Sequence, residues 1–165
     1  ITSDTMEHVP DIRRAFAEMA RVCRPGGGIF AISGPLWNAR SGPHWGASYY
    51  DYPWIHLRMN EDEIIAFTER RKLEQPDSPY ASPDQIRYFM HDLYFNKRPA
   101  REYLEICAGL QGMEVIQNYI DQEDASGVDP AVIAMMEEKG FDRQELFGLM
   151  HNYVGRKVAP AGAPG

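Results

Sequence analysis

The sequence predicts an α/β fold whose sheet is at least partly parallel. Residues 12–23 place apolar side chains at spacings of three and four, which is typical of one helix face. The uninterrupted apolar run 29–32 is typical of a strand buried on both faces of a parallel sheet. Residues 1–3 read as the end of an earlier strand, so the unit is strand, helix, strand. A right-handed crossover brings both strand ends to one edge, where open α/β sheets bind ligands.

The ends of the first helix carry conventional signals. We expect Pro10 at the first helical position, where no amide donor is needed. Asp11 suits the positive end of the helix, and Arg21 and Arg24 suit the negative end. The turn Pro25-Gly26-Gly27 then ends it.

Residues 35–59 form a long segment with neither a helical nor a strand period. A loop of this length in a compact domain is a lid, a binding loop or disordered. Disordered segments are poor in aromatic residues, whereas this one holds all three tryptophans of the chain. We therefore expect a lid or substrate loop, carrying Trp37, His44, Trp45, Tyr49, Tyr50, Tyr52, Trp54 and His56.

The rest of the chain predicts alternating helices and strands. Capping-box spacing begins helices at Asn60 and at Ser82. Further helices are expected from Pro99 to near Gly112 and over 129–140, and Asp142 to Glu145 are expected to cap one more short helix. Strands are expected over 113–120 and 152–158. The small, flexible residues 159–165 are expected to be a disordered tail.

Composition limits the class of protein. The chain has 165 residues, of which 44% are hydrophobic and 25% charged, which is typical of one globular domain. Its net charge of −7 argues against a nucleic-acid partner. No apolar run reaches the ~18 residues of a membrane span, and no signal peptide is recognisable. Two cysteines make no disulfide framework, so we expect a cytoplasmic protein. The sequence leaves open whether the protein forms a homodimer.

Several segments resemble a known family. Glu7-His8-Val9-Pro10-Asp11 and the later Arg24-Pro25-Gly26-Gly27 resemble the second half of class I S-adenosylmethionine-dependent methyltransferases, especially the small-molecule group called type 11. In that family the first segment follows the fourth strand and the second leads into the fifth, here 29–33. Residues 104–116 resemble the helix leading to the sixth strand, and 151–157 resemble the seventh, antiparallel strand.

The resemblance implies a fold and a domain plan. The fold would be a partial Rossmann-like methyltransferase sheet, strands four to seven, with helices on both faces. Residues 1–158 would be the C-terminal part of one methyltransferase domain, with 35–98 as a lid and substrate insertion. Ser33-Gly34-Pro35-Leu36-Trp37 and the following Gly42-Pro43-His44-Trp45 look like the lid of some members.

The resemblance also implies an activity, which is methyl transfer from S-adenosylmethionine to a small-molecule acceptor. The acceptor would be an oxygen or nitrogen of a sugar, lipid precursor or secondary metabolite. The family binds the cofactor mainly through a glycine-rich turn and an acidic residue that precede the fourth strand. This sequence contains neither, so we expect a truncated chain, a fragment that is inactive alone. The alternative is a non-catalytic α/β module whose aromatic loop binds a ligand or protein partner.

Candidate site residues follow from the resemblance. Glu7 and His8 would form the catalytic wall, with His8 as a proton acceptor near neutral pH; alternatively they only cap the next helix. Thr2, Ser3 and Asp4 would hold the methionine part of the cofactor, or are ordinary loop residues. The candidates for the lining of an acceptor pocket are Gly34, Trp37, His44, Trp45, Tyr49, Tyr50, Trp54 and His56. We expect two or three of these side chains to touch the acceptor and the others to pack the loop onto the domain.

No metal site is expected. The spacings of His44, His56 and His91 fit no compact ligand motif. No nucleophile elbow is present, so hydrolase chemistry is not favoured either.

Overall fold

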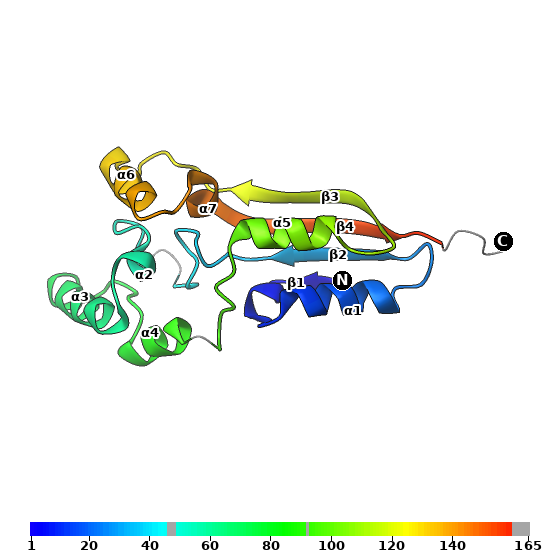
Figure 1. Ribbon diagram of the computed structural model, residues 1–165. Helices are drawn as coiled ribbons and strands as arrows, with labels where there is room; N and C mark the ends of the chain where they lie inside the picture. The colour runs from blue at the N-terminus through cyan, green and yellow to red at the C-terminus, as the bar shows by residue number, and fades with distance from the viewer. Residues whose placement is uncertain (46–48, 92, 160–165) are drawn as a thin grey trace.

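The computed structural model describes residues 1–45, 49–91 and 93–159. Its centre is one open sheet of four strands in the order β1-β2-β4-β3 (Figure 1). The strands are β1 (Thr2–Ser3), β2 (Gly28–Ser33), β3 (Met113–Gln122) and β4 (Gly148–Lys157). β1 and β2 are parallel, whereas β4 lies between β2 and β3 and is antiparallel to both. The predicted α/β class is confirmed.

Helix α1 (Ile12–Val22) connects the two parallel strands. Its N-cap is Asp11, whose side chain accepts a hydrogen bond from the Arg14 backbone N–H at 2.9 Å. Pro10 therefore precedes the cap, and our placement of Pro10 inside the helix was wrong. The buried residues Ile12, Phe16 and Ala20 form the stripe that faces the sheet.

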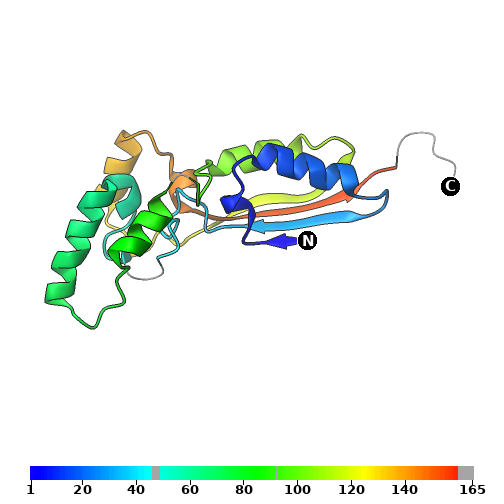
Figure 2. The same ribbon diagram turned by 90° about the horizontal axis from the view of Figure 1, so that it is seen from below.

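Both helices that pack on the sheet, α1 and α5 (Ala100–Ala108), lie on the same face (Figure 2). Burial along β2 therefore alternates: Ile29 and Ala31 are buried, whereas Phe30 is 41% exposed. No helix of the described residues covers the face that carries Phe30. The expectations of helices on both faces and of a strand buried on both sides were wrong for this part of the chain.

The remaining helices gather beyond one end of the sheet (Figure 1). They are α2 (Ile55–Arg58), α3 (Glu61–Glu74), α4 (Pro83–Met90), α6 (Pro130–Glu138) and α7 (Arg143–Phe147). The predicted capping boxes at Asn60 and Ser82 are confirmed, since each pairs with Glu63 or Gln85 three residues later. These helices have apolar cores of their own, one around Ile64 and Ile86 and one around Trp54 and Phe147.

Several element limits differ from those expected. Helix α2 lies within 35–59, where no helix was predicted, because its single turn is too short to show a period. Strand β3 continues two residues past the predicted end at 120, and β4 begins at 148 instead of 152 and ends at 157 instead of 158. The two strands pair along almost their whole lengths. Of the predicted tail, residues 160–165 lie outside the described residues. No helix in the described part of the chain is long and apolar enough to cross a bilayer.

Candidate functional site

The candidate site begins directly after β1, in the short 3-10 helix η1 (Met6–His8). The Glu7 side chain is only 2% exposed, and its Oε2 accepts a hydrogen bond from the Gly34 backbone N–H at 3.1 Å. Gly34 is the first residue after β2. The carboxyl ends of the two parallel strands therefore meet at one edge, as the sequence predicted, and Glu7 joins them.

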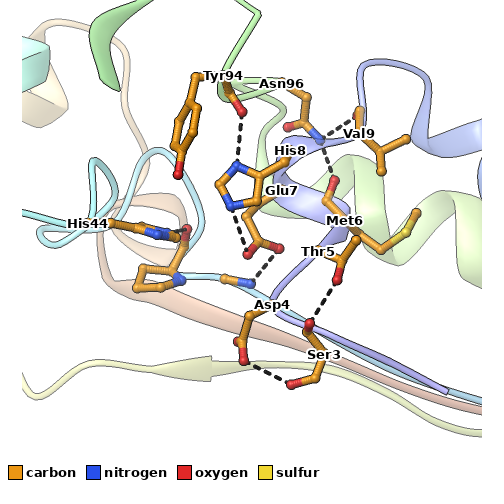
Figure 3. Close-up of polar contacts among 12 residues, drawn as sticks. Ser3, Asp4, Thr5, Met6, Glu7, His8, Val9, His44, Tyr94 and Asn96 are labelled. Atoms are coloured by element: carbon orange, nitrogen blue, oxygen red, sulfur yellow. Dashed lines mark hydrogen bonds and ion pairs between the residues drawn. The ribbon is translucent and has the colours of Figure 1, made fainter. Parts of the chain in front are cut away.

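His8 has a defined tautomer. Its Nδ1 lies 2.9 Å from the Tyr94 carbonyl oxygen, which can only accept a hydrogen bond (Figure 3). The neutral ring therefore carries its proton on Nδ1 and a lone pair on Nε2. That Nε2 lies 3.6 Å from Glu7 Oε1. His8 can thus take up a proton at Nε2, next to a carboxyl group.

Burial shifts the acid–base behaviour of Glu7. Loss of hydration raises the pKa of its carboxyl group, and backbone hydrogen bonds and the neighbouring His8 oppose only part of this effect. The 3.6 Å between His8 Nε2 and Glu7 Oε1 is too long for a hydrogen bond, and Glu7 Oε1 has no other hydrogen-bond partner among the described residues.

A distant segment fixes the turn that carries this pair. The Asn96 side-chain amide donates to the carbonyl oxygens of Met6 at 2.7 Å and Val9 at 3.0 Å. The Asn96 backbone N–H donates to the Glu7 carbonyl oxygen at 2.9 Å. The sequence analysis missed both Asn96 and Tyr94. No local signal marks them, because their partners lie about 90 residues earlier in the chain.

Of the four non-glycine residues with positive φ in the described part of the chain, three lie around the pair, and the fourth, Trp54, precedes α2. Asp4, His44 and Lys97 have φ angles of 48°, 59° and 53°. These values lie in the left-handed region, which residues other than glycine seldom adopt. Asp4 precedes η1, Lys97 follows Asn96, and the His44 ring centroid lies 5.6 Å from that of His8. Such outliers cluster at functional sites, where the surrounding structure holds them.

His44 lines a hollow of about 200 Å³, and its ring centroid lies 5.6 Å from that of His8. Its Nε2 donates to the Pro35 carbonyl oxygen at 3.1 Å, and burial lowers the pKa of the ring. Trp45 also lines the hollow, and Tyr49 packs behind Trp45 with ring centroids 5.2 Å apart. The described residues that line the hollow are His44, Trp45, Pro79, Tyr80, Ala81, Gln85 and Phe89.

Other predicted pocket residues lie in the core. Trp54 is fully buried, and its indole N–H donates to the Leu146 carbonyl oxygen at 3.0 Å. His56 is buried, and its Nε2 lies at a distance of 2.8 Å from the Trp37 carbonyl oxygen. The ring of Trp37 packs against that of Phe95. Contact of Trp54 or His56 with an acceptor would require this core to open, so burial points to a supporting role.

Gly34 and Tyr50 differ from these core residues. A side chain at Gly34 would meet the Leu149 carbonyl oxygen at 2.5 Å, and its φ of 145° favours glycine. This glycine therefore allows the close approach that places its N–H on Glu7. Tyr50 is 51% exposed and lies beneath the Arg40 guanidinium group, outside the lining of the hollow.

The three predicted cofactor residues are placed at the same strand end. Ser3 and Asp4 are exposed, and the Ser3 hydroxyl donates to Asp4 Oδ2 at 2.9 Å (Figure 3). Thr2 is half-buried within β1, beside Ala31 of β2. An exposed carboxylate suits the positively charged sulfonium or amino group of S-adenosylmethionine.

The first part of the chain matches a known family. Residues 1–31 match the model of a protein family described as methyltransferase domain. The match spans β1, the Glu7–His8 turn, α1 and the beginning of β2. It supports a class I S-adenosylmethionine-dependent methyltransferase domain at this end of the chain. No curated protein matches the chain.

The family match covers the same residues that form the candidate site at the end of β1. Glu7, His8 and the three predicted cofactor residues all lie inside the matched range. The hollow beside His44 lies outside it, so the match carries no information about the acceptor.

Proposed function

We propose that this chain is the acceptor-side part of a methyltransferase domain that transfers a methyl group from S-adenosylmethionine to an oxygen or nitrogen of a small molecule. The observation that carries the proposal is the Glu7–His8 pair at the carboxyl end of β1, inside the family match. The match favours this enzyme over a non-catalytic binding module.

The sheet supports the assignment. We assign β1, β2, β3 and β4 to strands four, five, six and seven of a Rossmann-like methyltransferase sheet. The support is the strand order together with the single reversed strand β4. Residues 35–98 would be the lid and substrate insertion of this domain. That the chain is part of a longer protein stays a prediction.

In the proposed mechanism the chain's own residues position the reactants and move one proton. When bound, S-adenosylmethionine supplies a methyl group on a positively charged sulfur, which an oxygen or nitrogen nucleophile can displace. Ser3 and Asp4 would hold its methionine end, with Thr2 beside them. His8 Nε2 would accept the proton that the acceptor loses, and buried Glu7 would stabilise the imidazolium that results.

The test is a methyl-transfer assay with S-adenosylmethionine labelled in its methyl group, using the natural gene product that carries this chain. We expect His8→Gln to lower kcat by roughly 10²- to 10⁴-fold, the usual contribution of a general base. Cofactor affinity should stay unchanged, because His8 would act on the acceptor. The matched control is His91→Gln, at an exposed histidine that belongs to neither the pair nor the hollow.

Two results would contradict the proposal. One is a His8→Gln enzyme with the kcat of the wild type. The other is a gene product that neither binds S-adenosylmethionine in calorimetry nor transfers its label to any small acceptor.

A further inference from the structure

The buried carboxyl group of Glu7 has one oxygen without a partner. Its Oε2 accepts a hydrogen bond from the Gly34 backbone N–H at 3.1 Å, whereas Oε1 has no hydrogen-bond partner among the described residues. The Glu7 side chain is only 2% exposed. A buried oxygen in this state is costly unless a ligand or a water molecule donates to it. The unpaired oxygen therefore points to a donor group that binds beside it.

A second acceptor lies next to this oxygen. The His8 ring donates from Nδ1 to the Tyr94 carbonyl oxygen, so its Nε2 carries a lone pair. Nε2 lies 3.6 Å from Glu7 Oε1 (Figure 3). At this separation one donor atom can lie about 2.9 Å from both, which is the usual hydrogen-bond length. The pair thus offers two acceptors to a single ligand atom.

The number of hydrogens on the ligand atom decides how well it fits. A hydroxyl group has one hydrogen and can donate to only one of the two acceptors. A neutral primary amine has two hydrogens and can donate to Oε1 and Nε2 together, and its lone pair stays free to attack a methyl group. An amine therefore satisfies the whole site, whereas a hydroxyl leaves one buried acceptor unpaired.

The charge at the site also favours nitrogen. A neutral amine becomes positively charged as its bond to carbon forms, whereas a hydroxyl that gives up its proton gathers negative charge on oxygen. The acids whose charges act here are Glu7 itself and Asp4, which acts on Glu7. Carboxylate charge stabilises a centre that becomes positive and repels one that becomes negative. Burial raises the pKa of Glu7, and a cation beside it favours its charged form.

Tyr94 can open the site to a ligand. Because Glu7 Oε1 is buried, a ligand reaches it only when a neighbouring side chain turns aside. The Tyr94 side chain is half-buried, and its ring centroid lies 4.8 Å from that of His8. Its phenol also lies close enough to Glu7 for the acid to raise the pKa of Tyr94, although burial is the larger cause. Rotation of this side chain leaves the Tyr94 carbonyl on His8, so the lone pair on Nε2 is kept.

We propose that Glu7 Oε1 and His8 Nε2 together bind a primary amino group of the acceptor, and that this nitrogen receives the methyl group. The inference rests on the function proposed above and narrows its acceptor to a nitrogen with two hydrogens. The nitrogen lone pair forms a bond to the methyl carbon, the carbon–sulfur bond breaks, and its electron pair stays on sulfur. The methylated nitrogen then loses one proton to His8 Nε2, which passes it to solvent.

The first experiment measures binding without the cofactor, so that it does not depend on catalysis. Benzylamine and benzyl alcohol share one ring and one linker and differ only in the donor group. Each is titrated into the natural gene product that carries this chain, and NMR signals of the His8 ring report the dissociation constant. We expect the amine to bind at least about tenfold more tightly than the alcohol. The protonated amine also has hydrogens for both acceptors.

Glu7→Gln tests the unpaired oxygen directly. Its amide keeps an oxygen for the Gly34 N–H and places an NH₂ donor where Oε1 was. We expect this variant to bind benzylamine at least about tenfold more weakly and to leave the binding of benzyl alcohol within about twofold of the wild type. The matched control is Glu18→Gln, which removes the same charge at a 55% exposed position of α1 and should change neither affinity.

The number of methyl groups transferred is a second readout. The product of one transfer has a single N–H and satisfies only one of the two acceptors. With labelled S-adenosylmethionine and benzylamine, we therefore expect the second methyl transfer to be at least about tenfold slower than the first. Equal rates for the two transfers would contradict the requirement for two hydrogens.

The outcomes separate this inference from the proposed function. A preference for the amine that Glu7→Gln removes supports amine binding by the pair, even if the protein transfers no methyl group. The inference is overturned if the alcohol binds as tightly as the amine, if Glu7→Gln keeps the preference, or if neither probe binds, which would leave a water molecule as the partner of Oε1. Transfer of label to a hydroxyl compound but to no amine would leave the proposed function standing and remove the inference alone.

Discussion

Glu7 and His8 are neighbours in sequence with opposite surroundings. The Glu7 side chain is 2% exposed, whereas that of His8 is 30% exposed. Burial raises the pKa of the Glu7 carboxyl group, while His8 keeps access to solvent and to a ligand. The Tyr94 carbonyl decides which imidazole nitrogen is free to act. At this scale, the chemistry of the site depends on one buried carboxyl group and one oriented ring.

Buried His56 makes stability depend on pH. Burial lowers its pKa from 6.5 to about 3, so the folded state keeps the ring neutral where the unfolded chain binds a proton. The unfolded state thus gains protons as the pH falls below 6.5, and stability decreases. Each pH unit in that range costs about 1.4 kcal/mol for one such group. We expect His56 to remove about 2 kcal/mol between pH 6.5 and pH 4.5, since the full slope is reached only below the unfolded-state pKa.

The measurement is urea unfolding at several pH values for the wild type and for His56→Gln, whose amide can still donate to the Trp37 carbonyl. The variant should lose less stability over this range, by the amount assigned to His56. His151, whose pKa burial lowers to about 4, adds a similar loss to both proteins. Identical pH dependence in the two proteins would show that His56 is not held neutral.

Helix α5 depends on a cap supplied from far along the chain. Its N-cap residue is Pro99, whose side chain makes no capping hydrogen bond. Instead, the Glu145 carboxylate of α7 accepts from the backbone N–H groups of Ala100 at 2.7 Å and Arg101 at 3.0 Å. A carboxylate is favourable at the positive end of a helix. Glu145 thereby connects α7 to α5, one of the two helices that cover the sheet.

Removing this cap should destabilise the fold. Glu145→Ala leaves two backbone donors at the end of α5 without their partner, and we expect a loss of about 1–3 kcal/mol in the free energy of unfolding. Glu145→Gln keeps one good acceptor and should lose less. Urea unfolding measures both, with Glu138→Ala at an exposed position of α6 as the control, expected within about 0.5 kcal/mol of wild type. An Ala variant as stable as this control would show that water caps α5 equally well.

The whole molecule has one covered and one open sheet face. The covered face packs Phe16, Ile106 and Tyr153 against each other in one core. On the open face, Phe30 is 41%, Ile116 57% and Tyr119 45% exposed. Apolar residues gathered on an open sheet favour association with other apolar surfaces.

Reducing the apolar character of the open face should reduce this association. We expect Phe30→Thr to lower the binding of an apolar fluorescent dye and the apparent mass in light scattering. Threonine suits a strand, so the free energy of unfolding should change by less than about 1 kcal/mol. Leu73→Thr, at an 83% exposed position of α3, is the control for a single exposed apolar residue. Equal effects of the two substitutions would show that the open face has no special role.

The sequence by itself determined the elements whose signals are local. The apolar period of residues 12–23, the breaker at Pro25 and the capping boxes at Asn60 and Ser82 each act within a few residues, so α1, β2, α3 and α4 could be predicted. The Glu7–His8 turn could be singled out only through its resemblance to a family.

Only the tertiary structure decided how these parts form a site. Asn96 and Tyr94 act on a turn about 90 residues away, and no pattern along the chain encodes such a pairing. The aromatic residues of 35–59 are alike in sequence, yet packing buries Trp54 and leaves His44 and Trp45 around a hollow. Burial and proximity are properties of the packed chain, because each depends on which distant segments exclude water from a side chain.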